Sequence, residues 1–275
     1  MCLLVMAFGL DPGAPLIVGA NRDEHLDRPA TAMTVLRESG PRILGGRDEV
    51  AGGTWLAVNE HGLVAGLTNR PLPDGPDPAR RSRGELPLAL ASHRHADEAV
   101  DHFVATFRPR HYNPAWFLVG DRRSLYAVDL TDGERPTAKR LEPGIHVLEN
   151  NPLSAASAKV DHVRRLLGRL EDLRGEEVMT RIRGVLADHS TPEPTAVTGS
   201  RRPQSLAACV HTEDYGTRSS NLIRIPASET ERPHVLYADG HPCRSHFFDA
   251  TALWSAPPPV TGGPDGFSDW HPDAG

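Results

Sequence analysis

The sequence predicts an α+β fold in which antiparallel β-hairpins alternate with pairs of helices. Apolar runs of strand length are separated by turn residues, and apolar residues recur at helical spacing in the middle of the chain. The length of 275 residues with 39% hydrophobic content suits a domain with a substantial core. We therefore expect one layered domain over residues 1–256, with helices outside packed sheets, and a disordered tail rich in Pro, Gly and Asp over 257–275.

The N-terminal part has the pattern of β-structure. Asp11-Pro12-Gly13 is a turn signal, because Pro presets φ and Gly supplies positive φ. The apolar runs beside such turns have no polar face, so we expect strands that are buried on both sides. Two hairpins are predicted, with strands at Leu3–Phe8 and Leu16–Ala20, and at Thr54–Val58 and Leu63–Leu67.

The remaining chain alternates helices with strands. Val100, Phe103, Val104 and Phe107 recur at helical spacing, and a second stripe is formed by Val160, Val163, Leu167 and Leu170. Helices are predicted at Gly84–His93, Asp97–Phe107, Ala156–Leu173 and Glu176–Ala187. Strands are predicted at Ala115–Gly120, Leu125–Leu130, Ile145–Leu148, Leu206–His211, Asn221–Ile225 and Val235–Tyr237. Two polar, proline-containing loops, Pro71–Arg83 and Ser190–Pro203, are expected to shape a binding pocket.

Composition excludes several classes of function. A net charge of −6 does not favour binding to a nucleic-acid backbone, and no apolar stretch is long enough to span a bilayer. Lys139 and Lys159 are the sole lysines among 30 basic residues, which is typical of a GC-rich genome. Three scattered cysteines predict neither a disulfide framework nor a zinc site, so we expect a cytoplasmic protein.

Cys2 is the first candidate for chemistry. Removal of Met1 would place a thiol nucleophile and an α-amine on one residue. The amine has an ordinary pKa of about 7.7 to 8.0, so it can accept a proton near neutral pH. This pairing is the N-terminal variant of the nucleophile-and-base arrangement. The alternative is that Cys2 is a small buried residue at the start of a strand.

The segment Asn21-Arg22-Asp23-Glu24 follows the second predicted strand directly. If the first two strands form a hairpin, Arg22 and Asp23 lie near Cys2. A carboxylate there could hold the α-amine, and an arginine could lower the thiol pKa. The alternative is a solvated turn with a local ion pair. Trp55, after paired glycines, is expected to pack in the core or to line a pocket.

Polar donors also follow several other predicted strands. Asn69 ends one strand and could donate to an oxyanion. Asn150 and Asn151 follow another strand, while Tyr215 and Arg218 precede one. Each signal is weak alone, but together they place polar groups at strand ends, where a site would be built.

The 14 histidines provide no convincing metal site, because neither His93-Arg94-His95 nor the pair His241 and His246 has a third ligand in a rigid element. We therefore predict no metal ligand and no cofactor.

Several segments resemble the NRDE-motif family, which is the transport and Golgi organisation protein 2 family. The resemblance runs from about Met1 to Phe247 and rests on ordered motifs: Met1-Cys2-Leu3-Leu4, Asn21-Arg22-Asp23-Glu24, Gly46-Arg47-Asp48, Gly52-Gly53-Thr54-Trp55-Leu56, Leu67-Thr68-Asn69, Tyr112-Asn113-Pro114, Pro143-Gly144-Ile145-His146 and Tyr215-Gly216-Thr217-Arg218-Ser219-Ser220. That family is similar to the N-terminal nucleophile hydrolases. The resemblance implies a four-layer αββα sandwich.

A more distant similarity to bile-salt hydrolases and penicillin V acylases implies roles for individual residues. Cys2 would be the nucleophile and Asp23 would hold the α-amine. Asn69 would donate to the oxyanion, Asn150 would orient the amine or the intermediate, and Arg218 would tune the thiol. The acylases carry Arg-Asn-x-Asp, whereas Arg22 here directly precedes Asp23. Arg22, Trp55, Asn151 and Tyr215 are expected to contact substrate.

The resemblance implies two functions, one from the residue roles above and one from the association of the family with haem trafficking and lipid metabolism. The first is an N-terminal cysteine amidohydrolase or acyltransferase that attacks an amide or thioester carbonyl of a small molecule through an acyl-enzyme. The second is a trafficking protein that binds haem or an acyl lipid without catalysis, for which His93, His102, His111 and Cys2 are the candidate axial ligands. The sequence leaves the substrate and the oligomeric state open.

Overall fold

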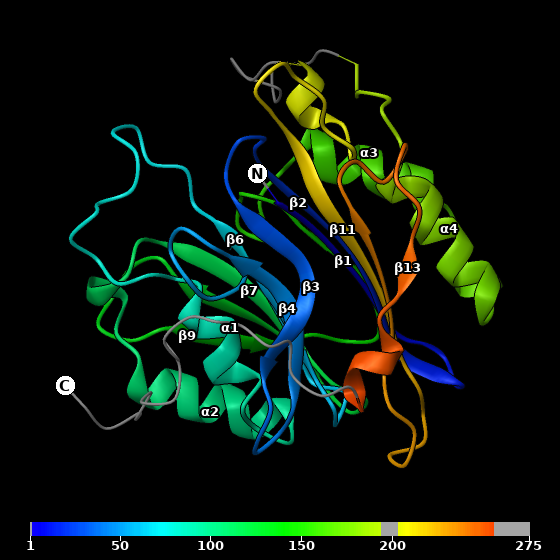
Figure 1. Cartoon of the computed structure of the whole chain (residues 1–275), viewed down its shortest axis with the longest axis horizontal. Helices are drawn as coiled ribbons and strands as arrows, with labels where there is room; N and C mark the ends of the chain where they lie inside the picture. The colour runs from blue at the N-terminus through cyan, green and yellow to red at the C-terminus, as the bar shows by residue number, and fades with distance from the viewer. Residues whose placement is uncertain (1, 194–202, 256–275) are drawn as a thin grey trace.

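The computed structural model describes residues 2–193 and 203–255, which form two antiparallel sheets packed face to face between outer helices (Figure 1). The first sheet has the strand order β10-β1-β2-β11-β12-β13 and the second β3-β4-β5-β6-β7-β8-β9. The four-layer αββα sandwich predicted from the sequence is confirmed. The strands of the first sheet are β1 Cys2–Asp11, β2 Ala14–His25, β10 Gly144–Leu148, β11 Tyr215–Ile225, β12 His234–Asp239 and β13 Phe248–Asp249. Those of the second are β3 Ala30–Arg37, β4 Ile43–Asp48, β5 Leu56–Asn59, β6 Val64–Asn69, β7 Ala115–Gly120, β8 Leu125–Leu130 and β9 Thr137–Arg140.

Strand β1 shows why the N-terminal runs have no polar face. Successive side chains on a strand point to opposite sides of the sheet. Leu3 and Val5 pack in the core beneath the outer helices, whereas Leu4 and Met6 pack in the core between the sheets. By the same alternation, Cys2 belongs to the side that faces the second sheet.

Two helix pairs cover the outer faces of the sandwich (Figure 1). Helices α1 (Glu85–Leu90) and α2 (Ala96–Thr106) lie on the second sheet, and α3 (Ala158–Leu167) and α4 (Glu176–Leu186) lie on the first. Ser157 caps α3 by accepting a hydrogen bond from the Val160 N–H at 3.2 Å. The predicted helix Ala156–Leu173 is too long, because Gly168 adopts a φ of +60° that ends α3, and a 3₁₀ turn follows.

The sequence did not predict β3 and β4, because β4 contains the pair Gly45-Gly46, which has the composition of a turn. These glycines allow strands to approach closely. A Cβ on Gly45 would lie 2.4 Å from the Leu56 carbonyl oxygen, and one on Gly46 would lie 2.9 Å from the Ala32 carbonyl oxygen. Glycine in a strand interior marks such a close backbone approach.

The predicted strand Leu206–His211 is wrong. Pro203–Leu206 form a 3₁₀ turn, and the segment after it makes an isolated bridge between His211 and Gly216. Its backbone is instead bound to the end of α4, where the Cys209 N–H donates to the Asp188 carbonyl at 2.9 Å. The predicted tail 257–275 and most of the predicted loop Ser190–Pro203 lie outside the described residues.

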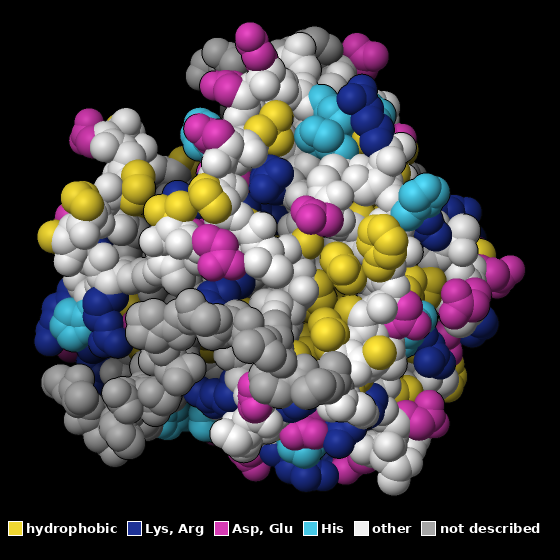
Figure 2. Space-filling view, in the orientation of Figure 1, with side chains coloured by type: hydrophobic (Ala, Val, Ile, Leu, Met, Phe, Trp, Pro, Cys, Tyr) yellow, Lys and Arg dark blue, Asp and Glu magenta, His cyan; other side chains and the backbone are white. Residues whose placement is uncertain are grey.

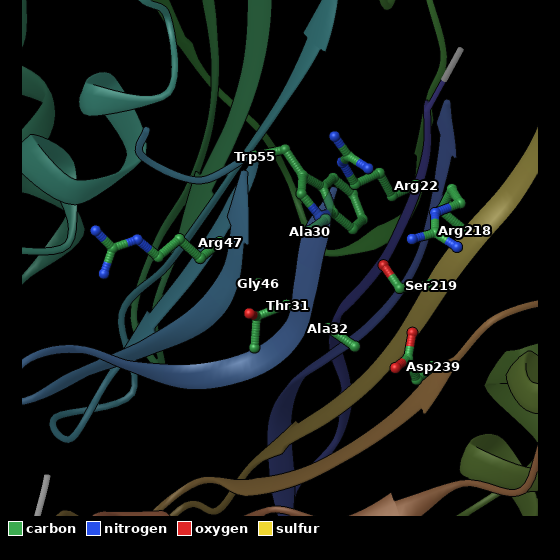
Figure 3. Close-up of a pocket in the computed structure, with 10 residues that line it drawn as sticks. All are labelled: Arg22, Ala30, Thr31, Ala32, Gly46, Arg47, Trp55, Arg218, Ser219 and Asp239. Atoms are coloured by element: carbon green, nitrogen blue, oxygen red, sulfur yellow. The ribbon is translucent and has the colours of Figure 1, made fainter. Parts of the chain in front are cut away.

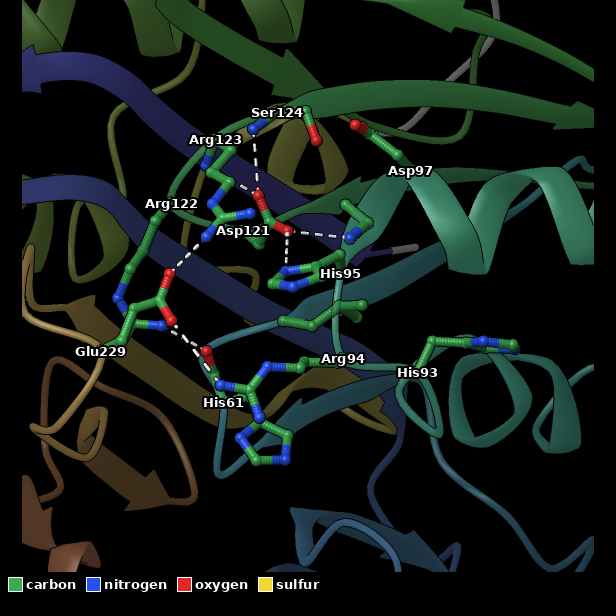
Figure 4. Close-up of polar contacts among 12 residues, drawn as sticks. His61, His93, Arg94, His95, Asp97, Asp121, Arg122, Arg123, Ser124 and Glu229 are labelled. Atoms are coloured by element: carbon green, nitrogen blue, oxygen red, sulfur yellow. Dashed lines mark hydrogen bonds and ion pairs between the residues drawn. The ribbon is translucent and has the colours of Figure 1, made fainter.

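Arg122, in the turn between β7 and β8, fastens the two sheets at one end of the sandwich (Figure 4). Its guanidinium donates to the carbonyls of His61 and Pro226, which belong to turns of opposite sheets. The neighbouring Asp121 carboxylate accepts from the Ala96 N–H at 2.8 Å and so caps α2. The sheets are thus joined at this end. Among the described residues, no helix has both the length and the apolar character needed to cross a membrane.

Candidate functional site

A cavity of about 720 Å³ opens where β1 begins and β2 and β6 end, and it reaches under the loop that follows β6. In Figure 2 the outline of the molecule is notched beside this loop, and acidic and basic side chains alternate over the viewed face. Seven of the nine site residues predicted from the sequence line the cavity: Cys2, Arg22, Asp23, Trp55, Asn69, Asn150 and Tyr215. The structure therefore brings together residues that are far apart in the sequence.

Strand register places Cys2 between two of these residues. Cys2 lies opposite Arg22 in the β1–β2 pair, and the pairing of Leu4 with Leu148 in β10 directs the chain so that Asn150 follows beside Cys2. The Cys2 backbone nitrogen donates to the Asn150 Oδ1 at 3.0 Å. An asparagine carbonyl thus holds the nitrogen that would be the α-amine of a chain beginning at Cys2.

Cys2 lines the cavity, and the residue as a whole is 8% exposed. Burial raises the pKa of the Cys2 thiol above its ordinary value, and the charged N-terminus and the Arg22 guanidinium oppose this rise. The Asp23 backbone N–H also favours the thiolate by hydrogen bonding, whereas the Asp23 carboxylate disfavours it. A neutral thiol at rest, which needs a base to remove its proton, follows from this environment.

Side chains from β11 and α3 contact the Asp23 carboxylate. Thr217, its partner in the β2–β11 pair, donates its hydroxyl to the Asp23 Oδ1 at 2.6 Å. The Lys159 Nζ of α3 lies 3.5 Å from the Asp23 Oδ2, and both side chains are fully buried. Tyr215 donates its hydroxyl to the Asp23 carbonyl at 2.8 Å. Sequence reasoning missed Lys159. The one feature that distinguished this residue was that it is one of two lysines among 30 basic residues.

Asn150 also links the two sheets at the cavity. Its Nδ2 donates to the Asn69 carbonyl oxygen at 2.5 Å, so the end of β6 lies beside Cys2. The Asn69 Oδ1 is buried and has no hydrogen-bond partner among the described residues. An unpaired side-chain amide atom in this position marks a place for a ligand group. The predicted role of the Asn69 Nδ2 as an oxyanion donor stays a prediction.

Arg22 and Arg218 approach each other from neighbouring strands, with the Trp55 indole across from them, around a smaller pocket (Figure 3). Arg22 donates to the Asp48 carboxylate of β4 at 2.8 Å, which connects the two sheets. The Arg22 Nη1, the Trp55 Nε1 and the Arg218 Nε are all buried without a hydrogen-bond partner within residues 2–193 and 203–255. All three donors belong to side chains that line this smaller pocket, which has a volume of about 10 Å³.

Two predicted site residues do not line the main cavity. Arg218 lines the smaller pocket beside it, and Asn151 turns away and donates to the Glu149 carboxylate at 2.7 Å. Their predicted roles stay predictions. The rings of His93 and His102 lie with centroids 5.0 Å apart and are tilted by 44°, and His111 contacts Arg110. None of these three histidines lines the cavity with Cys2.

The loop at 71–83 contributes a residue that sequence reasoning missed. Arg83 lies half-buried in the cavity wall and donates to the Pro114 carbonyl at 3.2 Å. Burial lowers the pKa of Arg83, and the proximity of the Cys2 sulfur and Glu24 opposes this change. Arg83 makes no ion pair with any residue that the structure describes. Its charge therefore faces the cavity near Cys2.

The described fold matches solved structures of low sequence identity. A variant of the conjugated bile acid hydrolase from Clostridium perfringens is 10% identical with a TM-score of 0.51, and the match covers 91% of this chain and 92% of that chain. A second variant of that hydrolase is 11% identical with a TM-score of 0.52, covering 90% and 92%. At such low identity the similarity shows a shared N-terminal nucleophile hydrolase fold.

The chain is also similar in sequence to animal proteins. It is 29% identical over 264 residues to the Transport and Golgi organization protein 2 homolog of Bos taurus, covering 87% of this chain and 92% of that protein. The Homo sapiens homolog is 27% identical over 273 residues, covering 87% and 92%. The family model described as Transport and Golgi organisation 2 matches residues 1–232. The chain belongs to the Transport and Golgi organisation 2 family.

Proposed function

We propose that this protein is an N-terminal cysteine amidohydrolase or acyltransferase that acts on an amide or thioester carbonyl. The observation that carries the proposal is the position of Cys2: its thiol lies at the wall of a 720 Å³ cavity, and its own nitrogen is held by Asn150 at 3.0 Å. Support also comes from the fold, which is shared with a hydrolase of conjugated bile acids. The proposal requires Cys2 to be the first residue of the mature chain.

The reaction uses the two functional groups of Cys2. The neutral α-amine takes the thiol proton, and the Cys2 sulfur attacks the substrate carbonyl to form a tetrahedral intermediate. The carbon–nitrogen or carbon–sulfur bond then breaks, and the leaving group departs with the proton from the α-ammonium. Water, or an acceptor amine in the transferase, attacks the resulting thioester and releases the acyl group with regeneration of the thiol.

The surrounding residues supply the electrostatics of this sequence. Asn150 fixes the direction of the amine lone pair through its Oδ1. Arg22 is the nearest cation to the thiol on the paired strand and favours the developing thiolate. In this proposal the side-chain N–H of Asn69, which lines the same cavity as Cys2, stabilises negative charge on the substrate oxygen.

The experiment begins with the intact mass of the purified protein, which should show loss of Met1. The protein is then incubated with a panel of amides and thioesters that includes glycine-conjugated bile acids and long-chain N-acyl amides. Trapped acyl-enzyme should map to Cys2 and not to Cys209 or Cys243. Replacing the nucleophile by Cys2→Ala should lower the turnover by at least about 10³-fold.

Two results would refute the proposal. Quantitative retention of Met1 would leave Cys2 without an α-amine, and full turnover in Cys2→Ala would remove the nucleophile from the mechanism.

The second candidate function is the binding of haem or an acyl chain without catalysis, because the same cavity could hold either cargo. Haem titration would then shift the Soret band of the wild type and of Cys2→Ala alike, with no turnover of any substrate.

A further inference from the structure

Four metal-binding side chains gather in one place outside the cavity. Donor atoms of His189, Cys209, His211 and Cys243 all lie within 4.8 Å of one another. The sequence predicted no metal site because these donors are scattered from position 189 to position 243 and follow no zinc-finger spacing. Tertiary structure alone brings them together.

Three separate segments supply the donors. His189 follows α4, and the hydrogen bond from the Cys209 N–H to the Asp188 carbonyl at 2.9 Å places Cys209 beside it. His211 lies two residues on, where the chain bridges Gly216 at the start of β11. Cys243 lies in a turn after β12, which the Ser245 N–H closes by donating to the His241 carbonyl at 2.9 Å.

The distances match a tetrahedral zinc site. The His211 Nε2 lies 3.4 Å from the Cys209 Sγ and 3.3 Å from the Cys243 Sγ. Zinc bonds of about 2.3 Å to sulfur and about 2.0 Å to nitrogen, at tetrahedral angles, place those atoms about 3.5 Å apart. A cation can therefore enter with small movements of the side chains.

The ring of His241 stacks on that of His211 with centroids 3.8 Å apart. This contact fixes the plane of His211 while its Nε2 points to both sulfurs. Neighbours that orient a ligand in this way are a regular feature of metal sites. Cys209 is 1% exposed, whereas His189 is exposed, so the cluster extends from the buried interior to the protein surface.

We propose that His189, Cys209, His211 and Cys243 bind a structural zinc ion. Two thiolates and two neutral imidazoles give the Cys₂His₂ donor set that zinc prefers, and four protein ligands leave no open position for catalysis. Binding would release the thiol protons and leave a neutral complex, which suits a partly buried position.

The zinc would brace the segment that supports the candidate active site. Val210 lies between two of the ligands; its carbonyl accepts from the Thr217 N–H at 2.9 Å, and its N–H donates to the Thr217 Oγ1 at 2.9 Å. Thr217 in turn donates to the Asp23 carboxylate at 2.6 Å. The ion would thus tie the end of α4 and the turn after β12 to the strand that holds Asp23.

The test is metal analysis of the full chain purified under reducing conditions from zinc-supplemented medium. We expect about one zinc per chain by mass spectrometry of the elements. After zinc is removed, Co²⁺ should give the intense visible absorption of a tetrahedral thiolate site, with a sulfur-to-cobalt charge-transfer band. Added Zn²⁺ should raise the Tm of the metal-free protein. None of these measurements depends on enzymatic turnover.

Matched variants localise the ion. His189→Ala and Cys209→Ser should each weaken zinc binding by more than about 100-fold, because loss of a direct ligand exceeds the effect of losing a supporting neighbour. His246→Ala, which removes an exposed histidine outside the cluster, and Cys2→Ser should keep the full zinc content. His189 is exposed, so its variant should fold even where Cys209→Ser does not.

Three results would overturn the zinc site. Metal-free protein that takes up neither Zn²⁺ nor Co²⁺ excludes it. Equal zinc content in wild type, His189→Ala and Cys209→Ser places the ion elsewhere. A Cys209–Cys243 disulfide, detected in a second preparation purified without reductant as the loss of two hydrogens that returns with a reductant, would identify a redox pair instead. These outcomes are independent of whether Cys2 is catalytic.

Discussion

The Lys159 ammonium and the Asp23 carboxylate lie 3.5 Å apart, and both side chains are fully buried. Asp23 belongs to β2, which pairs with β1, the strand that begins at the proposed nucleophile Cys2. Two buried opposite charges must compensate each other, because each loses its hydration on folding. Lys159 thus places a buried cation next to the Asp23 carboxylate, on the strand that pairs with the strand of Cys2.

The first prediction concerns this pair. Lys159→Met should lower the free energy of unfolding by about 3 to 5 kcal/mol, because it leaves the Asp23 carboxylate buried without its cation. Urea unfolding followed by circular dichroism measures the change. Lys139→Met replaces an exposed lysine and should change stability by no more than about 0.5 kcal/mol.

Adding Asp23→Asn to Lys159→Met should recover part of the lost stability, since neither charge then remains buried. Strictly additive losses in the double variant would show that the two charges do not interact.

The second prediction uses two adjacent glycines at the cavity. Gly52 and Gly53 have φ values of +67° and +78°, but only a Cβ on Gly53 would collide, at 2.4 Å, with the carbonyl of Gly84. Gly52→Ala should cost about 1 to 2 kcal/mol for the backbone conformation alone. Gly53→Ala should cost clearly more, because the backbone of Gly84 must also move. Thermal unfolding of both variants measures these costs. Equal losses of stability in the two variants would contradict the close approach of Gly53 to the Gly84 carbonyl.

The third prediction is a pH dependence at Asp11. Burial alone would raise the pKa of Asp11, but hydrogen bonds from the Gly175 N–H at 2.7 Å and the Gly13 N–H at 2.8 Å outweigh burial and lower it. A carboxylate with a lowered pKa stabilises the fold above its unfolded pKa, and this contribution disappears as the pH falls through the folded pKa.

Asp11→Asn should therefore destabilise the protein by about 1 to 2 kcal/mol at neutral pH, and the difference should shrink as the pH falls below the ordinary value of 3.8. Unfolding curves recorded between neutral pH and strong acid measure it. A stability difference that stays constant over this range would show that the Asp11 charge has no part in the contact.

The fourth prediction concerns Arg83 and rests on the proposed function. Its guanidinium has no carboxylate partner within the described chain, so it is suited to bind an anionic group on the substrate. Arg83→Met should raise KM for an anionic acyl substrate by about tenfold or more and leave KM for a neutral analogue unchanged.

Arg80→Met is the matched control, because Arg80 belongs to the same loop but lies 3.5 Å from the Asp77 carboxylate. It should raise KM by less than Arg83→Met does. Equal effects of both variants on anionic and neutral substrates would assign Arg83 a role in loop structure instead.

Local patterns in the sequence predicted most of the architecture. Continuous apolar runs beside a turn signal identified the β1–β2 hairpin, and helical spacing identified α2 and the position of α3, because both patterns are local. The errors fall where tertiary contacts override local preference. A pair of glycines is locally typical of a turn, but Gly45 and Gly46 lie inside β4. Glycine is needed there because the neighbouring backbone leaves no room for a side chain.

The sequence by itself determined the family, the layered fold and the polar residues that end up around Cys2, because each is expressed in short motifs. Tertiary structure alone decided that Lys159 pairs with Asp23 across 136 positions, that Arg83 faces the cavity, and that Cys209 meets Cys243. Such contacts depend on the register of strands and the packing of helices over the whole chain. No local repeat encodes them, since partners far apart in sequence meet only after the sheets have closed.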